Sequence, residues 1–481
     1  MKILFAASEA APFAKTGGLA DVAGSLPAAL ASLGHDVRVV IPRYRKVDST
    51  IFSLKPIATF SVPLGDWQER CDVFQTTKTK NVTNYFIGKD IFFDRPELYG
   101  TAKADYPDNA ERFIFFSRAV LELCDNLNFE PDIVHCNDWQ TGLIPIYLKQ
   151  FYRKSDVLNH AKIVFTVHNL GYQGLFPRED MRLTGLGWDV FTPSGIEYWG
   201  KINFLKAGLV YSDIITTVSR TYSQEIQTPE YGYGLEGVLA KRKNELHGIV
   251  NGIDYLEFDP RYDHEIAKTY SASTLTGKYT CKMALQNMVG LPLSDNLLAG
   301  MVTRLAEQKG LDIVLDALSQ ITALDVHVII LGTGDEAYHK LLAKAENDYK
   351  NKMRVLLQYN DKIAKSIYAG CDLYLMPSLY EPCGLGQMIA LRYGTVPLVR
   401  RTGGLVDTVS EYNPKTKIGT GFLFEEYAAP ALVSCLQRAV DIYKDRQIWK
   451  HLVRNGMKQD FSWARSAQEY VHLYQRALGA Q

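Results

Sequence analysis

Short apolar runs rich in β-branched residues recur along the chain, and helix-like segments separate them. In the N-terminal half these runs include residues 3–7, 37–41, 133–135, 163–167 and 214–218, and in the C-terminal half 298–302, 326–331, 373–376 and 396–399. Such runs, alternating with helices, are typical of parallel strands that helices cover on both faces. The sequence therefore predicts an α/β protein built from doubly wound parallel sheets.

The strand pattern stops and restarts, which indicates two domains. The stretch between residues 251 and 293 is polar and weakly periodic, and turn-forming residues gather at its start, in Asn-Gly-Ile-Asp at 251–254. A chain of 481 residues is also longer than a single hydrophobic core normally serves. We expect one Rossmann-like domain over residues 1–254 and a second over residues 255–463.

The balance of charges and the pattern of cysteines argue against several classes of protein. The chain has 53 Lys and Arg residues and 53 Asp and Glu residues, so it has no net charge that would attract nucleic acid or an anionic membrane. A neutral polymer could bind without such a charge. The seven cysteines include no Cys-x-x-Cys pair, which argues against a zinc site and favours reduced thiols. No apolar stretch approaches the roughly 20 residues of a membrane span. With the first strand starting at residue 2, we expect no signal peptide and a cytoplasmic protein.

Chemically useful residues follow the predicted strands at the points where the strands end. These residues are Lys15, Asp138, His168, Arg304, Gly332 and Glu381. Ligands of open parallel sheets bind outside the carboxyl ends of the strands. The pattern therefore predicts a ligand-binding cleft between the two domains.

The segment Lys-Thr-Gly-Gly-Leu at residues 15–19 follows the first strand and precedes a helix. Gly17 and Gly18 let the backbone approach a ligand closely. The helix start offers unpaired N–H groups to an anion, and Lys15 adds a positive charge. The segment favours a phosphate-bearing ligand, with Asp21 near enough to bind a hydroxyl or amine. A glycine loop that begins a helix, with a solvated lysine, is the alternative.

Two further segments share a pattern with this loop. They are Arg-Leu-Ala-Glu-Gln-Lys-Gly-Leu-Asp at 304–312 and Ser-Leu-Tyr-Glu-Pro-Cys-Gly-Leu at 378–385. Together the three segments resemble the motifs of bacterial glycogen synthases and plant starch synthases, and the resemblance covers essentially the whole chain. It implies the GT-B glycosyltransferase fold, with two Rossmann-like domains facing a cleft and a last helix, residues 464–481, packing back on the first domain. Tyr470, Leu473, Tyr474 and Ala477 share one side of that helix.

The resemblance also implies a reaction. A glucose unit would pass from ADP-glucose to the non-reducing end of an α-1,4-glucan (glycogen, starch or a maltooligosaccharide) with retention of anomeric configuration. A UDP-glucose-dependent glucan synthase, or a related nucleotide-sugar enzyme on the same fold, is the alternative. Because one sugar nucleotide would contact residues of both halves, we expect the cleft to close during catalysis.

Arg304 and Lys309 lie five residues apart at the end of a predicted strand, before an apolar helix. Two cations in this position suit a diphosphate, although a solvated surface pair is the alternative. The resemblance implies that they stabilise the leaving nucleoside diphosphate. No Asp-x-Asp pattern is evident, and Lys15 adds a third cation, so we expect no metal and no cofactor.

Glu381 stands in a proline- and glycine-containing turn after a strand. A carboxylate can accept hydrogen bonds from two neighbouring sugar hydroxyls, and an acid at a helix N-terminus is the alternative. The resemblance assigns Glu381 to the glucose 3- and 4-hydroxyls and places the backbone of Cys383, Gly384 and Leu385 in the donor pocket. Many related transferases have a second glutamate, which binds ribose, where this chain has Ile389. A ribose contact from this segment is therefore in doubt.

His168 leaves a very apolar strand, where a histidine is either structural or catalytic. The resemblance implies that its side chain contacts the 6-hydroxyl of the transferred glucose and that its carbonyl lies near the reaction centre. Asp138 lies close to where an acceptor would enter, and Trp139 offers a flat face for a sugar ring or for ordinary core packing.

Three residues complete the expected donor site. The resemblance implies that Asn251 is an interdomain asparagine of the family, although it could equally be a turn residue. It also implies that Tyr359 stacks on adenine. Gly332 belongs to a glycine turn that we expect to line the nucleotide pocket.

Three other classes of protein are alternatives. A nucleotide-sugar epimerase or sucrose-type synthase on this scaffold is disfavoured by the complete motif around Glu381. A glucan phosphorylase would need a lysine motif for pyridoxal phosphate, which we do not find. A catalytically silent glucan-binding protein is disfavoured because every charged motif is present. Retention would suggest a double displacement, yet no motif supplies an obvious nucleophile. The resemblance implies instead that attack and departure occur on the same face, with the leaving phosphate taking the acceptor proton.

Overall fold

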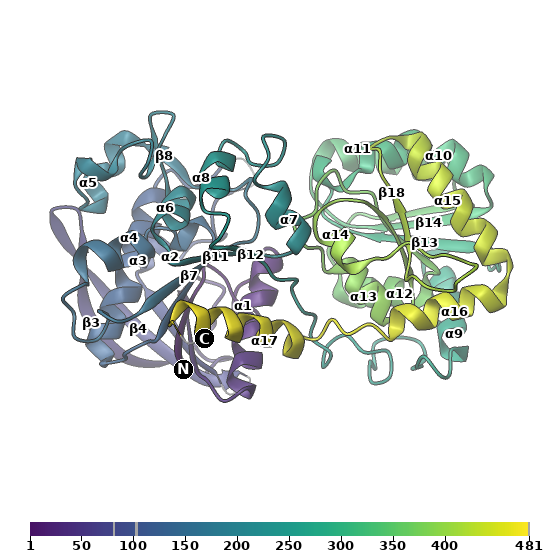
Figure 1. The fold of residues 1–481 in the computed structure, drawn as a ribbon. Coiled ribbons are helices and arrows are strands. Elements are labelled where there is room, and N and C mark those ends of the chain that lie inside the picture. Colours follow the sequence, from purple (N-terminus) through teal and green to yellow (C-terminus); the bar gives the residue numbers. More distant parts are fainter. Residues whose placement is uncertain (80–81, 102–103, 480–481) are drawn as a thin grey trace. The chain divides into compact units, whose positions relative to one another are not determined.

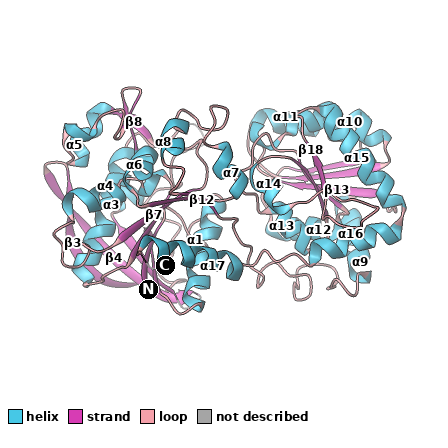
Figure 2. Cartoon of the chain, viewed as in Figure 1, coloured by secondary structure: helices cyan, strands magenta, loops and turns pink. Residues whose placement is uncertain are grey.

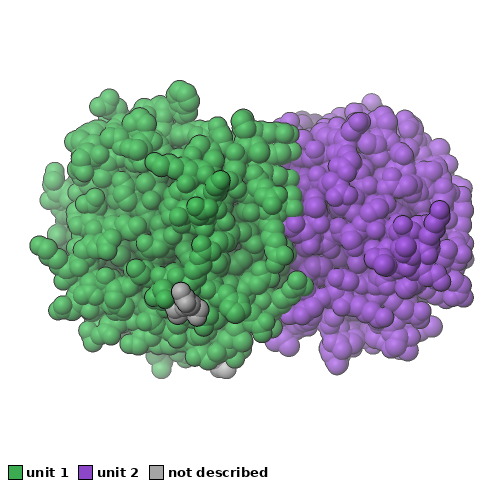
Figure 3. All heavy atoms as spheres, viewed as in Figure 1, with its two compact units in different colours: residues 1–252, 463–481 green, residues 253–462 purple. Residues whose placement is uncertain are grey.

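The computed structural model describes residues 1–79, 82–101 and 104–479. Residues 480 and 481 of the expected last helix lie outside the described residues. The chain forms two compact units, residues Met1–Gly252 with Trp463–Gln481 (unit 1) and residues Ile253–Ser462 (unit 2) (Figure 3). The chain passes between the units after residue 252 and again after residue 462, within two residues of the expected boundaries.

Unit 1 is built on a nine-stranded sheet with the order β12-β11-β7-β6-β1-β2-β5-β4-β3. Its parallel strands are β1 (Lys2–Ala6), β2 (Asp36–Pro42), β5 (Val82–Gly88), β6 (Ile133–Asn137), β7 (Lys162–Val167), β11 (Ile214–Thr217) and β12 (Leu246–Gly248). The chain builds outward from β1 in both directions, so the strand order reverses between β1 and β6. In a doubly wound sheet, such a reversal opens a crevice for ligands.

Unit 1 has antiparallel strands at one edge of its sheet, which the sequence analysis did not predict. Strands β3 (Lys55–Leu64) and β4 (Trp67–Thr79) extend the sheet in antiparallel fashion beyond β5. A two-residue turn joins β3 to β4, and its Gly65 has a φ of +58°, a conformation that glycine favours. A second, smaller antiparallel sheet contains β8 (Leu175–Pro177), β10 (Lys201–Asn203) and β9 (Glu197–Tyr198).

Helices cover the sheet of unit 1 (Figure 1). They are α1 (Gly18–Ser32), α2 (Asp90–Phe93), α3 (Asn109–Leu127), α4 (Ile144–Phe151), α5 (Met181–Thr184), α6 (Phe204–Tyr211), α7 (Arg220–Glu225), α8 (Glu236–Lys241) and α17 (Trp463–Ala477). Helix α17 packs on α1 and β7, with Tyr470 and Tyr474 fully buried. The Tyr474 hydroxyl lies 2.6 Å from Nδ1 of His135 in β6. The last helix is thus bonded directly to the centre of the sheet.

Unit 2 is a six-stranded sheet with the order β15-β14-β13-β16-β17-β18, and all neighbouring strands are parallel. The strands are β13 (Leu297–Val302), β14 (Val326–Leu331), β15 (Met353–Leu356), β16 (Leu373–Met376), β17 (Val396–Arg400) and β18 (Phe422–Phe424). The order reverses between β13 and β16, as it does in dinucleotide-binding sheets.

Helices of unit 2 lie on both sides of this sheet. They are α9 (Thr276–Val289), α10 (Leu311–Ala323), α11 (Glu336–Asp348), α12 (Asp361–Gly370), α13 (Gly386–Arg392), α14 (Gly403–Thr408), α15 (Ala429–Lys444) and α16 (Arg446–Met457). Figure 2 shows α10 and α11 on one side and α9, α12 and α16 on the other. The expected doubly wound architecture is therefore confirmed for unit 2.

Helix α9 occupies part of the stretch that the sequence indicated as weakly periodic. Its inner face carries Lys278 and Lys282, both buried. The Lys278 ammonium donates to the carbonyl oxygens of Ala369 and Tyr393 and to Oγ1 of Thr395, at 2.7 to 3.1 Å. Lys282 pairs with Asp372 at 2.7 Å. Buried lysines interrupt the apolar stripe by which a helix is recognised in a sequence.

Three further observations concern classes of site. All seven cysteines are buried thiols without a disulfide. Among the residues that the structure describes, no helix combines the length and the apolar character needed to cross a membrane. Within the same residues, no group of three or more His, Cys, Asp or Glu side chains is arranged to hold a metal ion.

Candidate active site

The structure places the six strand-end residues where the sequence predicts them. In unit 1, Lys15 follows β1, Asp138 follows β6 and His168 follows β7. In unit 2, Arg304 follows β13, Gly332 follows β14 and Glu381 follows β16. In each unit, residues of this set therefore flank the reversal of strand order.

The glycine loop of unit 1 presents an open backbone. A Cβ atom added at Gly17 or Gly18 would meet nothing within 4 Å, and neither glycine has a positive φ. Local packing and backbone conformation therefore do not require glycine here, which favours close approach by a ligand over a purely helix-capping role. Nζ of Lys15 lies 2.7 Å from Oδ1 of Asp21. Asp21, expected to bind a hydroxyl or amine, thus orients the lysine.

Glu9, which the sequence analysis missed, anchors this loop. Its carboxylate accepts hydrogen bonds from the Thr16 backbone N–H at 2.5 Å, from the Thr16 hydroxyl at 2.9 Å and from the Tyr99 hydroxyl at 3.1 Å. Burial raises the pKa of Glu9, and the hydrogen bonds from Thr16 and Tyr99 oppose that shift. The sequence signal was an acidic residue within an otherwise small and apolar segment, six positions before Lys15.

Asp138 has an unusual backbone conformation. Its φ of 57° and ψ of −178° lie in a region that residues other than glycine seldom adopt. Its Oδ1 accepts a hydrogen bond of 2.7 Å from the backbone N–H of His168. Burial raises the pKa of Asp138 to about 7, against the opposing effect of hydrogen bonds from the His168 and Asn169 backbone. Strain of this kind concentrates at functional sites, which supports the assignment of Asp138.

The hydrogen bonds of Asn137 assign the tautomer of His168. Nδ2 of Asn137 donates to the carbonyl oxygen of Ala6 at 3.0 Å, so its Oδ1 faces His168 Nε2 at 2.9 Å. Nε2 must then carry the proton, and Nδ1 keeps a lone pair. Burial lowers the pKa of His168 to about 3, so the ring is neutral. It can accept a hydrogen bond from a sugar hydroxyl at Nδ1.

Trp139 begins a 3₁₀ helix (Trp139–Thr141) and packs in an aromatic cluster. Its ring lies 4.9 Å from that of Phe113, 5.6 Å from Phe176 and 6.4 Å from Phe204. A Cβ added at Gly174 would lie 2.5 Å from the indole. The core-packing alternative therefore holds for much of this half-buried side chain.

Asn251 carries a buried acceptor near the end of unit 1. Its side chain is 6% exposed, and its Oδ1 has no hydrogen-bond partner among the residues that the structure describes. A buried amide oxygen without a donor is uncommon. This favours a binding role over that of a simple turn residue.

In unit 2, Lys309 and Glu381 form a buried ion pair. Nζ of Lys309 lies 2.6 Å from Oε2 of Glu381, and the Ser378 hydroxyl donates to the same oxygen at 3.1 Å. Gly310, with a φ of +72°, makes the approach possible, since a Cβ there would lie 2.1 Å from the carbonyl oxygen of Pro377. Lys309, expected at a diphosphate, is thus held by the carboxylate expected to bind the sugar. Arg304 is exposed to solvent.

The turn after Glu381 is tied down through its carbonyl groups. Nε2 of Gln387, which the sequence analysis did not assign, donates to the carbonyl oxygens of Cys383 and Gly384 at 3.0 Å each. Gly384 has a φ of +74°, and Leu385 precedes the first residue of α13. Residues 383–385 are thus held by Gln387 at the start of α13.

Two expected nucleotide contacts lie at the ends of neighbouring strands. A Cβ at Gly332 would lie 1.9 Å from the carbonyl oxygen of Thr303, so glycine is required where these two segments meet. Tyr359 follows β15, is 69% exposed, and donates from its hydroxyl to Asp361 at 2.7 Å. Ile389, in place of a second glutamate, is buried in α13.

Comparison with known proteins shows which families the chain matches. The starch synthase catalytic domain family matches residues 2–241, and the family of group 1 glycosyl transferases matches residues 289–455. The glycogen synthase of Koribacter versatilis is 47% identical over 99% of this chain and 98% of that protein. The glycogen synthase of Thermotoga maritima is 43% identical over 99% of each chain.

Solved structures agree with these relatives. The catalytic domain of starch synthase IV from Arabidopsis thaliana, bound to ADP and acarbose, matches with a TM-score of 0.92 and 33% identity over 99% of each chain. Sucrose-phosphate synthase from Thermosynechococcus elongatus matches with a TM-score of 0.63 over 100% of each chain, and at 17% identity it shows the GT-B fold alone. Full-length identity to glycogen synthases shows that the chain belongs to the glycogen and starch synthase family of glycosyltransferases.

Proposed function

We propose that this chain transfers glucose from ADP-glucose to the non-reducing end of an α-1,4-glucan, with retention of configuration. The observation that carries the proposal is the buried Lys309–Glu381 pair at the strand-order reversal of unit 2. The pair brings together a cation that can bind a diphosphate and a carboxylate that can accept hydrogen bonds from sugar hydroxyls. The ADP in the Arabidopsis starch synthase structure supports an adenine nucleotide as the leaving group.

Residues of unit 2 bind the donor in this proposal. Glu381 accepts hydrogen bonds from the glucose 3- and 4-hydroxyls, and Lys309 and Arg304 balance the charge of the diphosphate. Tyr359, which is exposed, stacks on adenine. Gly332 and the backbone of Cys383, Gly384 and Leu385 line the pocket.

Residues of unit 1 complete the donor contacts and bind the acceptor. The Gly17–Gly18 backbone and Lys15, which Asp21 orients, approach the donor phosphate. Nδ1 of neutral His168 accepts a hydrogen bond from the glucose 6-hydroxyl. The amide of Asn251 supplies an unsatisfied acceptor. Asp138 and the exposed part of Trp139 receive the terminal glucose of the glucan.

The proposed chemistry occurs on one face of the sugar. The bond between the anomeric carbon and the ADP oxygen breaks, and the acceptor 4-hydroxyl oxygen forms a new bond to that carbon from the same side. The hydroxyl proton passes to the leaving phosphate oxygen. Arg304 and Lys309 stabilise the negative charge that develops on ADP, and Lys15 adds to them. We propose that these cations make a metal ion unnecessary.

We also propose that the enzyme works in the cytoplasm, because seven thiols without a disulfide suit a reducing compartment. The alternative donor is UDP-glucose. One experiment tests the main proposal: purified protein is given radiolabelled ADP-glucose or UDP-glucose with a glycogen primer, and label is counted in the polymer. We expect label from ADP-glucose to enter the polymer, and we expect α-1,4-specific hydrolysis to release that label. Preference for UDP-glucose would establish the alternative, and no incorporation from either donor would refute the synthase proposal.

A further inference from the structure

The β9–β10 hairpin of unit 1 carries an exposed tryptophan in a strained position. Residues 199 and 200 form its two-residue turn, with φ values of 49° for Trp199 and 77° for Gly200. Turns with two positive φ angles normally contain Asn-Gly, and a bulky residue at the first position is a genuine outlier. The Trp199 side chain is 85% exposed, so core packing does not explain why tryptophan stands there.

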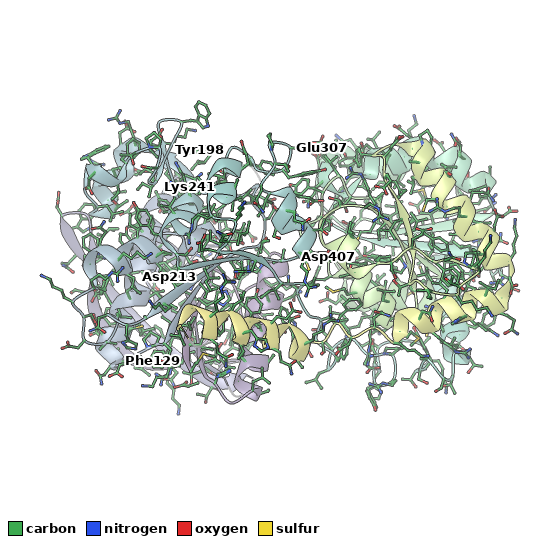
Figure 4. The ribbon with its side chains drawn as sticks, viewed as in Figure 1. Phe129, Tyr198, Asp213, Lys241, Glu307 and Asp407 are labelled. Carbon is green, nitrogen blue, oxygen red and sulfur yellow. The ribbon has the colours of Figure 1, made fainter. Side chains whose placement is uncertain are left out.

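A second aromatic residue repeats this arrangement nearby. Tyr233 has a φ of 49°, is followed by Gly234 with a φ of 76°, and is 40% exposed. The Tyr233 carbonyl oxygen accepts a hydrogen bond of 2.7 Å from the hydroxyl of Tyr198, the neighbour of Trp199. Tyr198 is labelled in Figure 4, and Figure 1 draws β8 and α8 in the same part of unit 1. The two turns that carry exposed aromatic residues are thus joined by a hydrogen bond from Tyr198, the neighbour of Trp199, to the backbone of Tyr233.

A short path connects these turns to the candidate acceptor site. Nε2 of Gln173 donates to the Tyr233 carbonyl oxygen at 3.0 Å. The next residue, Gly174, packs directly on the indole of Trp139, and Tyr172 on the other side of Gln173 is 57% exposed. Contacts of residues 172–174 therefore link the segment at Trp139, beside Asp138, to the turns that carry the exposed Tyr233 and Trp199.

We propose that Trp199, Tyr233 and Tyr172 form an outer platform for the α-1,4-glucan acceptor, and this inference rests on the proposed function. Only the terminal glucose of a polymer can occupy the site at Asp138, so the rest of the chain must lie on the surface beside it. Glucose rings present apolar C–H faces that stack on exposed aromatic rings. Backbone strain that persists at an exposed side chain points to a selected function, and a polymeric ligand supplies one.

Trp199→Asn separates binding from folding. Asparagine suits the turn better than tryptophan, so we expect a melting temperature equal to or above that of the parent. Loss of the stacking face should raise the KM for glycogen about fivefold while the KM for ADP-glucose changes by less than about twofold. In native gels that contain glycogen, the variant should be retarded less than the parent. This readout does not depend on turnover.

Trp67→Ala is the matched control, because Trp67 is an exposed tryptophan of the same unit in the antiparallel strand β4, 43% exposed. It should keep the retardation of the parent. Parental retardation of Trp199→Asn would overturn the platform, as would equal loss of retardation in Trp67→Ala. A parent that binds glycogen but incorporates no glucose would refute the proposed function and leave the platform standing.

Discussion

The ammonium of Lys309 donates a hydrogen bond of 2.6 Å to the carboxylate of Glu381, a residue 72 positions later in the chain. The two side chains are 14% and 7% exposed, so each buried charge is compensated by the opposite charge of its partner. In the proposed function, a diphosphate would compete with Glu381 for the lysine. Substrate binding would then release a carboxylate oxygen towards the sugar hydroxyls.

Replacing Glu381 by glutamine should lower kcat about 100-fold, because the amide retains the shape but not the paired acceptor oxygens or the charge. Initial rates with ADP-glucose and glycogen measure the effect, and thermal melting checks the fold. Glu425→Gln, which removes an exposed ion pair with Arg401 in the same unit, is the control. Turnover of Glu381→Gln within about threefold of the parent would remove Glu381 from the site.

Asp138→Asn should change how stability depends on pH. The Asp138 carboxyl has a pKa of about 7 in the folded protein and 3.8 as its ordinary value. Between those values the folded protein keeps a proton that the unfolded chain has released, so the free energy of unfolding decreases as pH rises through this range. The melting temperature of the variant relative to the parent should therefore be higher at pH 8 than at pH 5. Asp66→Asn, the same substitution at an exposed position of unit 1, is the control.

Glu9→Gln should loosen the glycine loop, because a glutamine side chain has one acceptor oxygen where Thr16 and Tyr99 now share two. We expect faster hydrogen exchange at the Thr16 amide and a KM for ADP-glucose raised about tenfold. Tyr99→Phe removes only one of these bonds and should leave exchange at Thr16 close to that of the parent. Unchanged exchange in Glu9→Gln would show that the loop does not need this anchor.

Tyr474→Phe should destabilise unit 1 by about 1–2 kcal/mol, because it leaves a nitrogen of the buried His135 ring without its partner. Burial lowers the pKa of His135 to about 3, so the neutral ring cannot compensate by gaining a proton at neutral pH. Urea unfolding measures the loss. The exposed Tyr279→Phe substitution is the control, and equal stability of Tyr474→Phe and the parent would contradict the prediction.

Activity should survive treatment with EDTA, because in the proposed function Lys15, Arg304 and Lys309 supply positive charge for the diphosphate. The assay is glucose incorporation after chelation and desalting, with and without added Mg²⁺ or Mn²⁺. An absolute requirement for either ion would overturn the metal-free proposal.

The sequence by itself determined where the central parallel strands lie and which polar residues follow them. Buried parallel strands need continuous apolar runs, and the carboxyl ends of such strands share one edge, so Lys15, Asp138 and Glu381 could be placed without coordinates. The glycines at 310 and 332 are different, because glycine is required there by the carbonyl oxygen of a distant segment, that of Pro377 or of Thr303. Local chemistry was sufficient for the strands and for the polar residues that follow them.

Only the tertiary structure decided which side chains meet. Glu9 anchors Thr16 and Asn137 assigns the proton of His168 through contacts that periodicity does not report. Helix α9 could not be recognised from its sequence pattern. Its buried lysines bind a carbonyl group, a hydroxyl and a carboxylate that lie about 90 or more residues away in the chain. Hydrogen bonds and ion pairs between distant segments depend on strand order and helix placement. That long-range pairing leaves no regular pattern in the sequence itself.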